Sequence, residues 1–193
     1  MKCLFITLLI FIVDNSNAQY SGVFFAKEFS KEAALYRAKS FVMSEVLGSS
    51  ANVVEFQIDP LSAATSGELT SLVYKCPEKK MEGLVLGFFG NRWNESGVIY
   101  QAYAFKNFSK ETALEMLNKI EVSLKEHTKF LKADYDNNNI YFKFDDITFL
   151  IYSSANINGF QRIRVFWKEF DSEWDFNAFK RTKKNLIFKL EKE

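Results

Sequence analysis

The sequence predicts an α+β fold, in which antiparallel sheet in one or two pieces is covered by about three helices. Three observations lead to this prediction. Apolar residues recur at helical spacing in two long segments, and six short segments are apolar in the manner of strands. In addition, the nine residues from Lys27 return from Lys106 with seven identities. The repeat indicates that one structural unit could occur twice.

The first predicted helix begins at Ser30 and ends near Gly48. Ser30 is a suitable N-cap because its hydroxyl can accept a hydrogen bond from a free backbone N–H, and Glu32 suits the positive end of the helix dipole. One side of the segment is apolar, which predicts an amphipathic helix packed against a sheet. This side comprises Ala34, Leu35, Ala38, Phe41, Val42 and Val46.

The second predicted helix begins at Ser109 with the same residues and has a cleaner apolar side. That side comprises Ala113, Leu117, Ile120, Leu124 and Leu131. His127, the only histidine of the chain, lies near the end of this helix. A positively charged imidazole would suit the negative end of the dipole, so capping is the preferred role for His127 over catalysis.

Three strands are predicted after each helix. They cover 52–58, 69–76 and 83–90 after the first helix, and 139–144, 147–153 and 160–167 after the second. The segment 147–153 is apolar on both faces, as a central covered strand would be.

Turn residues support these strands. Asp145-Asp146 and Asn158-Gly159 separate neighbouring strands in the second half. Pro60 and Pro77 are expected between strands, where a missing N–H costs nothing. Glycines at 83, 87 and 90 are expected to allow close packing or a bend, because no lysine follows them as in a phosphate loop.

An apolar leader precedes each helix, from Gly22 and from Gly97, so the order strand, helix, three strands occurs twice. This predicts a duplicated β-α-β-β-β unit over 20–93 and 97–170. The other interpretation is that two unrelated helices share a good capping sequence, and both interpretations stay open. Under duplication, the seam at Trp93–Gly97 is the first place to look for a site.

A C-terminal helix is predicted over 172–190. Ser172 and Asp175 would form a variant capping box at its start. The carboxylates of Asp171, Glu173 and Asp175 are then explained by the positive end of the helix dipole.

Residues 1–18 have the layout of a secretory signal peptide. Lys2 precedes an apolar run of 11 residues, and Ser16 and Ala18 fit the small-residue cleavage rule. The run is shorter than the roughly 20 residues that a membrane-spanning helix needs, so no stable membrane anchor is expected after cleavage. We therefore expect a single α+β domain over 19–193, exported to the periplasm or the exterior. The 20 lysines against 5 arginines indicate a bacterial source.

Composition excludes several classes of partner. The net charge of +1 gives no long-range field toward nucleic acid or an anionic membrane. Cys76 is the only cysteine after signal cleavage, so an internal disulfide is excluded and a buried apolar thiol is expected. With 48% apolar residues and 21 Phe, stability is expected to come from the core.

No catalytic residue and no cofactor are predicted. The chain has no Gly-x-Ser-x-Gly elbow, and a Cys76–His127 pair would depend on the fold to bring the two together. Zinc is unexpected with so few nitrogen and sulfur ligands. A calcium site is a weak candidate: Asp134, Asp136, Asn138 and Asp145 hold positions 1, 3, 5 and 12 of an EF-hand-like loop. Position 6 lacks glycine and strand follows in place of helix, which favours a plain polar loop.

A mixed aromatic and basic sheet face is the candidate binding surface. Its residues share the polar-side parity of neighbouring strands. They are Tyr141, Arg162, Arg164, Phe166 and Lys168. The predicted function is a secreted or periplasmic non-catalytic module that binds a partner protein or an apolar small molecule. The alternatives are a hydrolase that acts through carboxylates and an inhibitor or immunity-type protein.

Overall fold

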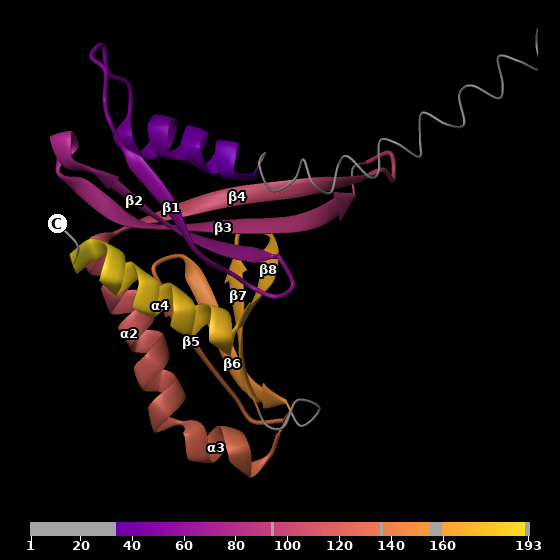
Figure 1. Ribbon diagram of the computed structural model, residues 1–193. Helices are drawn as coiled ribbons and strands as arrows, with labels where there is room; N and C mark the ends of the chain where they lie inside the picture. Colours follow the sequence, from indigo (N-terminus) through magenta and orange to yellow (C-terminus); the bar gives the residue numbers. More distant parts are fainter. Residues whose placement is uncertain (1–33, 94, 136, 155–159, 192–193) are drawn as a thin grey trace, which may run out of the picture. The chain divides into compact units, whose positions relative to one another are not determined.

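The computed structural model describes residues 34–93, 95–135, 137–154 and 160–191 (Figure 1). The predicted signal peptide 1–18, the leader from Gly22 and the cap Ser30 lie outside these residues, as do Asp136 and Asn158-Gly159. Two parts are distinguished, residues up to Phe41 and residues from Val42 onward. In the first, residues 34–41 are helical, as predicted. The second part contains both sheets.

Sheet A is a four-stranded antiparallel meander in the order β1-β2-β3-β4. Its strands are β1 (Gln57–Ala63), β2 (Leu69–Cys76), β3 (Met81–Trp93) and β4 (Ile99–Ser109). The predicted strand 69–76 is therefore confirmed at both ends, and 83–90 forms the middle of the longer β3. The leader from Gly97 is also a strand, but it pairs with β3 in sheet A.

Sheet B repeats the same topology in the order β5-β6-β7-β8. Its strands are β5 (Asn139–Phe144), β6 (Ile147–Ser154), β7 (Phe160–Trp167) and β8 (Phe170–Asp175). The three strands predicted for the second half are confirmed within one residue. The fold is thus α+β with two similar four-stranded antiparallel sheets, as predicted at that level.

Helices connect and cover these sheets. The helical elements from Val42 onward are η1 (Val42–Leu47), the short η2 (Pro77–Lys79), α2 (Lys110–Glu126), α3 (Thr128–Ala133) and α4 (Phe176–Glu191). Gly48, with φ +70°, follows η1 and confirms where the first helix was expected to end. The second predicted helix is divided at His127, where the Thr128 hydroxyl donates to the carbonyl of Leu124 at 2.6 Å.

The first predicted strand was placed wrongly. Residues 53–56 have no regular structure, and β1 begins at Gln57 and contains Pro60. Proline is tolerated there because β1 is an edge strand, and the register with β2 shifts between Pro60 and Ser62. Pro77 does lie between strands, at the start of η2.

The start of the C-terminal helix was also predicted wrongly. Residues 170–175 form β8, and α4 begins only at Phe176. Ser172 and Trp174 are buried while Asp171 is exposed, which is the alternation of a half-buried strand. Ser172 is therefore no cap, and Asp175 alone is the N-cap: its Oδ1 accepts from the backbone N–H of Ala178 at 2.9 Å.

One hydrophobic core joins the two sheets through α2 and α4. Phe88 of β3 packs on Trp167 of β7, with ring centroids 4.9 Å apart. The side of α2 that the sequence predicted is buried throughout. α4 contacts β1 and β2 of sheet A as well as β7 and β8 of sheet B, so the helix that follows sheet B closes the core against sheet A (Figure 1).

The two sheets end in the same way. Phe108 at the end of β4 is buried and precedes the N-cap Ser109 of α2, and Trp174 at the end of β8 is buried and precedes the N-cap Asp175 of α4. Trp174 also packs edge-on against Phe179 at 5.5 Å, which makes a hydrophobic staple. The repeated unit in the structure is thus a four-stranded sheet that leads into a helix.

The boundary between the sheets is accordingly shifted from its expected position. The predicted seam at Trp93–Gly97 falls in the hairpin between β3 and β4, within sheet A. The chain leaves sheet A at Ser109, where α2 begins. The expected glycine packing is confirmed at Gly87: a Cβ there would meet Thr70 Oγ1 at 2.7 Å and the Phe105 ring at 3.0 Å.

Candidate functional site

The outer face of sheet B, opposite the core, gathers most of the predicted binding residues. Tyr141 lies opposite Leu150, Leu150 opposite Arg164, and Arg164 opposite Glu173, so one row crosses all four strands. Arg162 and Phe166 lie on the same face because they are two residues from Arg164 on β7. Tyr141 is the most open of these side chains, with 76% of its surface exposed.

The second face of β6 was expected to be covered, and it is only half-buried. Ile147, Phe149 and Ile151 point into the core and are fully buried. Leu150 and Tyr152, on the other face, keep part of their surface exposed. β6 is central in the sheet as predicted, but it leaves apolar surface at the solvent side.

Each arginine of the outer face has a carboxylate partner on β8. Arg162 Nη1 donates to Glu173 Oε2 at 2.6 Å, and Arg164 Nε donates to Asp171 Oδ1 at 2.8 Å. The hydrogen bond to Asp171 raises the pKa of Arg164. The face is therefore a charge-paired surface with aromatic side chains, and it has less basic character than the sequence suggests.

Lys168 is displaced from this row. It occupies the turn between β7 and β8 with φ +52°. Its ammonium lies 4.6 Å from the centre of the Trp167 ring. The outer face therefore unites four of the five predicted residues, and Lys168 stands at its end.

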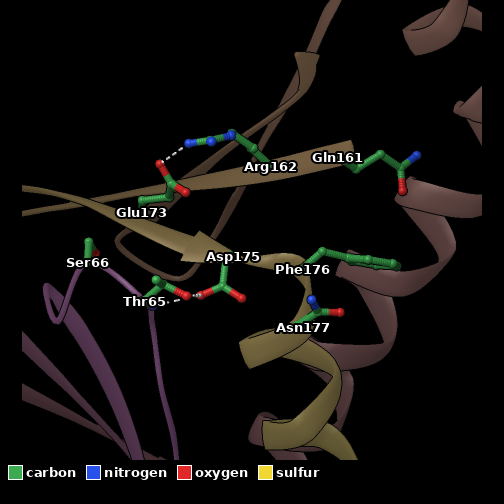
Figure 2. A pocket seen from close by; sticks show the side chains of 8 residues that line it. All are labelled: Thr65, Ser66, Gln161, Arg162, Glu173, Asp175, Phe176 and Asn177. Carbon is green, nitrogen blue, oxygen red and sulfur yellow. Dashed lines mark hydrogen bonds and ion pairs between the residues drawn. The ribbon is translucent and has the colours of Figure 1, made fainter. Parts of the chain in front are cut away.

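A pocket of about 440 Å³ opens where β8 passes into α4 (Figure 2). Three parts of the chain form it: the β1–β2 turn, the start of β7, and the junction of β8 with α4. Its lining side chains are Thr65, Ser66, Gln161, Arg162, Glu173, Asp175, Phe176 and Asn177. Arg162 and Glu173 belong to both the pocket and the outer face, so the two features are continuous.

Asp175 holds the walls of this pocket together. Its Oδ1 caps α4, while its Oδ2 accepts from the backbone N–H of Thr65 at 2.8 Å and from the Thr65 hydroxyl at 3.2 Å. Burial acts to raise the pKa of Asp175, but the hydrogen bonds from Ala178 and Thr65 outweigh it and lower the pKa. Asp175 is therefore an ionised anchor between the β1–β2 turn and α4.

Two further hydrogen bonds fix the remaining walls. The backbone N–H of Glu173 donates to Glu68 Oε2 at 3.0 Å, which links β8 to the β1–β2 turn. Gln161 Nε2 donates to the carbonyl of Leu124 in α2 at 3.4 Å. The pocket is thus supported by neighbours in both sheets and both long helices.

A second polar cluster joins the sheets on another side of the molecule. Lys106 of β4 donates to both Asp145 and Asp146 in the β5–β6 turn, and Trp167 Nε1 donates to Asp146 Oδ2 at 2.9 Å. Burial acts to lower the pKa of Lys106, but the bonds to the two carboxylates outweigh it and raise the pKa. The contacts connect sheet A to sheet B and leave Asp145 remote from the other calcium candidates.

The calcium candidates are not brought together. Asp134 ends α3 and precedes β5, whereas Asp145 follows β5, so a whole extended strand separates them. The side-chain amide of Asn138 donates to the carbonyl of Phe130 at 2.7 Å. Within the described ranges, no three histidine, cysteine or carboxylate side chains are placed to hold a metal ion. Cys76 is buried, as expected, while His127 is exposed.

Sequence reasoning named Glu173 and Asp175 but assigned both to a helix start. The alternation of Ser172 and Trp174 with three carboxylates was the signal for a strand in their place. Thr65 and Ser66 carried no comparable signal. They reach the pocket only because a turn of sheet A lies against β8, which is a tertiary contact.

Comparison with known proteins finds no matching family, no similar curated protein and no similar solved structure. Among the residues described, no helix has the length and apolar character to cross a membrane.

Proposed function

We propose that the protein is an exported, non-catalytic module that binds a partner protein through the outer face of sheet B. The row that runs from Tyr141 to Glu173 across four strands carries this proposal. Tyrosine and arginine are enriched in interfaces because each combines contact area with hydrogen bonding. An open tyrosine on the edge strand β5 and two paired arginines on β7, on the same face of the sheet, make such a set.

The preformed ion pairs support a binding role. Arg162 and Arg164 are held by Glu173 and Asp171 before any partner arrives, so little side-chain entropy is lost on association. The half-buried Leu150 and Tyr152 add apolar contact area between the charged rows. The face is balanced in charge, which suits a partner with a mixed polar and aromatic surface more than a polyanion.

The carboxylates of the pocket favour binding over hydrolysis. A hydrolase with two carboxylates needs one of them protonated as the acid, and that group has a raised pKa. The pKa of Asp175 is lowered, and both its oxygens accept hydrogen bonds from the protein. This carboxylate therefore supports structure, which leaves Glu173 without a second catalytic carboxylate in the pocket.

The proposal can be tested by site-specific photocrosslinking in the native host. A photoreactive amino acid at Tyr141 should give a discrete crosslinked product with one protein, because this side chain stands at the open edge of the face. The matched control is Val122, which is also exposed but lies on α2. Arg164→Glu should abolish the product. Identical products from both positions, or none from position 141, would contradict the proposal.

A further inference from the structure

We propose that the pocket at the junction of β8 and α4 binds a neutral polyhydroxylated ligand, a saccharide. The proposal rests on the pocket alone and does not require the protein partner. The volume of about 440 Å³ lies within the range of small-molecule sites, which is roughly 300–1,000 Å³. The walls are built, since Asp175, Thr65 and Glu68 fix them by hydrogen bonds that are present without ligand.

The charges in the pocket select against anionic ligands. Arg162 is already neutralised by Glu173, and Asp175 adds a further negative charge. A cationic ligand is disfavoured too, because the positive charge of Arg181 on α4 already acts on Asp175, the lining carboxylate that lies outside the Arg162–Glu173 pair. A neutral ligand avoids both penalties, since it leaves the existing ion pair intact.

The hydrogen-bonding groups match hydroxyls. In the part of the chain that the structure describes, the second carboxylate oxygen of Glu173, the side-chain oxygen of Gln161 and the amide of Asn177 have no hydrogen-bond partner. Arg162 supplies donors next to the Glu173 acceptor. A sugar hydroxyl donates and accepts at once, so two adjacent hydroxyls can bind both members of a guanidinium–carboxylate pair.

Phe176 supplies an apolar wall on one side of these polar groups. In Figure 2 its side chain extends beneath Gln161, away from Thr65 and Ser66. Its ring is held against Phe179, with centroids 6.4 Å apart, and by the ammonium of Lys180 at 4.2 Å. A sugar ring has polar edges and apolar C–H faces, and it therefore suits a pocket with one apolar wall and several planar polar groups.

The test is calorimetric titration of the purified protein with maltose, cellobiose, lactose and N,N′-diacetylchitobiose, with glucuronic acid and glucosamine as charged probes. We expect at least one neutral disaccharide to bind with a Kd below about 10 mM, and the charged sugars to bind more weakly. Glu173→Gln should weaken that binding by about tenfold, because it removes the charged acceptor.

Asp171→Asn is the matched control for this experiment. Asp171 pairs with Arg164 on the same two strands but does not line the pocket, so binding should stay within about twofold, although this variant also loses one arginine–carboxylate ion pair. Asn177→Ala, at an exposed position, should weaken binding without lowering the melting temperature. Absence of binding by all four neutral sugars, preference for glucuronic acid, or full binding by Glu173→Gln would overturn the proposal.

Discussion

Sheets A and B have the same strand order but bury different amounts of their surface. In β2 of sheet A, side chains on both faces are buried: Ser71 and Val73 on the core side, Leu72 and Tyr74 on the other. In β6 of sheet B, burial alternates, and only the core side is buried. One topology thus provides a sheet that is buried through its centre and a sheet with an open face.

This difference shows which surface is available for binding. A strand buried on both faces is mostly apolar on both, with its buried polar groups hydrogen-bonded, whereas an open face tolerates charged and aromatic side chains. Sheet B has its ion pairs and Tyr141 on that open face. Sheet A contributes to the pocket only through its β1–β2 turn.

The same substitution at equivalent positions should have unequal effects. Leu72 and Leu150 both lie on the second strand of their sheet, on the face away from the common core. Leu72→Ala should lower the free energy of unfolding by about 2–5 kcal/mol, because Leu72 is buried. Leu150→Ala should cost about 1 kcal/mol or less, because its surface is already partly exposed. Urea denaturation measures both, and equal losses would contradict the comparison.

The tight packing of sheet A should make one of its glycines sensitive to substitution by alanine. Gly87→Ala should cost about 1–3 kcal/mol, since the new Cβ would meet Thr70 and the Phe105 ring at 3.0 Å or less. Gly90→Ala on the same strand is the control. Its Cβ would lie 3.8 Å from the nearest atom, in the Phe170 ring, so the effect should stay within about 0.5 kcal/mol. Thermal denaturation distinguishes the two, and a neutral Gly87→Ala would show that sheet A has room to adjust.

The two N-caps, Ser109 after sheet A and Asp175 after sheet B, should also differ in how much they stabilise the protein. Ser109→Ala removes the bond to the Thr112 N–H and should cost about 1 kcal/mol. Asp175→Ala removes a cap and the contacts to Thr65, and should cost about 2 kcal/mol.

The loss of folding stability at low pH, here called the acid limb, gives an independent check on the anchoring role of Asp175. Because its folded pKa is lowered, its contribution is complete above about pH 4 and is lost as the pH falls through the folded value. Asp175→Asn should therefore flatten the decline of stability below pH 4. An unaltered acid limb in Asp175→Asn would argue against the anchoring role.

The sequence allowed the fold class and most strands to be predicted because local patterns determine them. The alternation of apolar and polar residues in β7 and the turn at Asp145-Asp146 can both be recognised in the amino-acid sequence. β8 was missed because its acidic outer residues resemble a helix start, and Pro60 was excluded from a strand although an edge position tolerates it. The outer face of sheet B could be predicted, because alternate residues of a strand point to the same side and this alternation also determines how neighbouring strands pair. The pocket could not, because Thr65 meets Asp175 across 110 positions of sequence.

The smallest expected effect concerns Lys106, which links the two sheets. Lys106→Met should cost about 0.2–1 kcal/mol, because Asp145 and Asp146 are largely exposed and water screens their charge. The pKa of Lys106 is raised, so its contribution is complete below about pH 10 and is lost as the pH rises through the folded value. Burial acts to raise the pKa of Asp146, but the bonds from Lys106 and Trp167 lower it, so its contribution is lost on acidification.

A double-mutant cycle of Lys106→Met with Asp146→Asn isolates this link. The coupling energy should be positive at neutral pH and should diminish toward both extremes, since either partner then loses its charge. Added salt should reduce it, as expected of partly exposed charges. The corresponding pair on the outer face, Arg164 and Asp171, lies within sheet B and should show coupling that persists above pH 10, because arginine stays protonated. Equal alkaline behaviour of the two pairs would mean that the link between the sheets depends on packing around Trp167, with the charge of Lys106 contributing little.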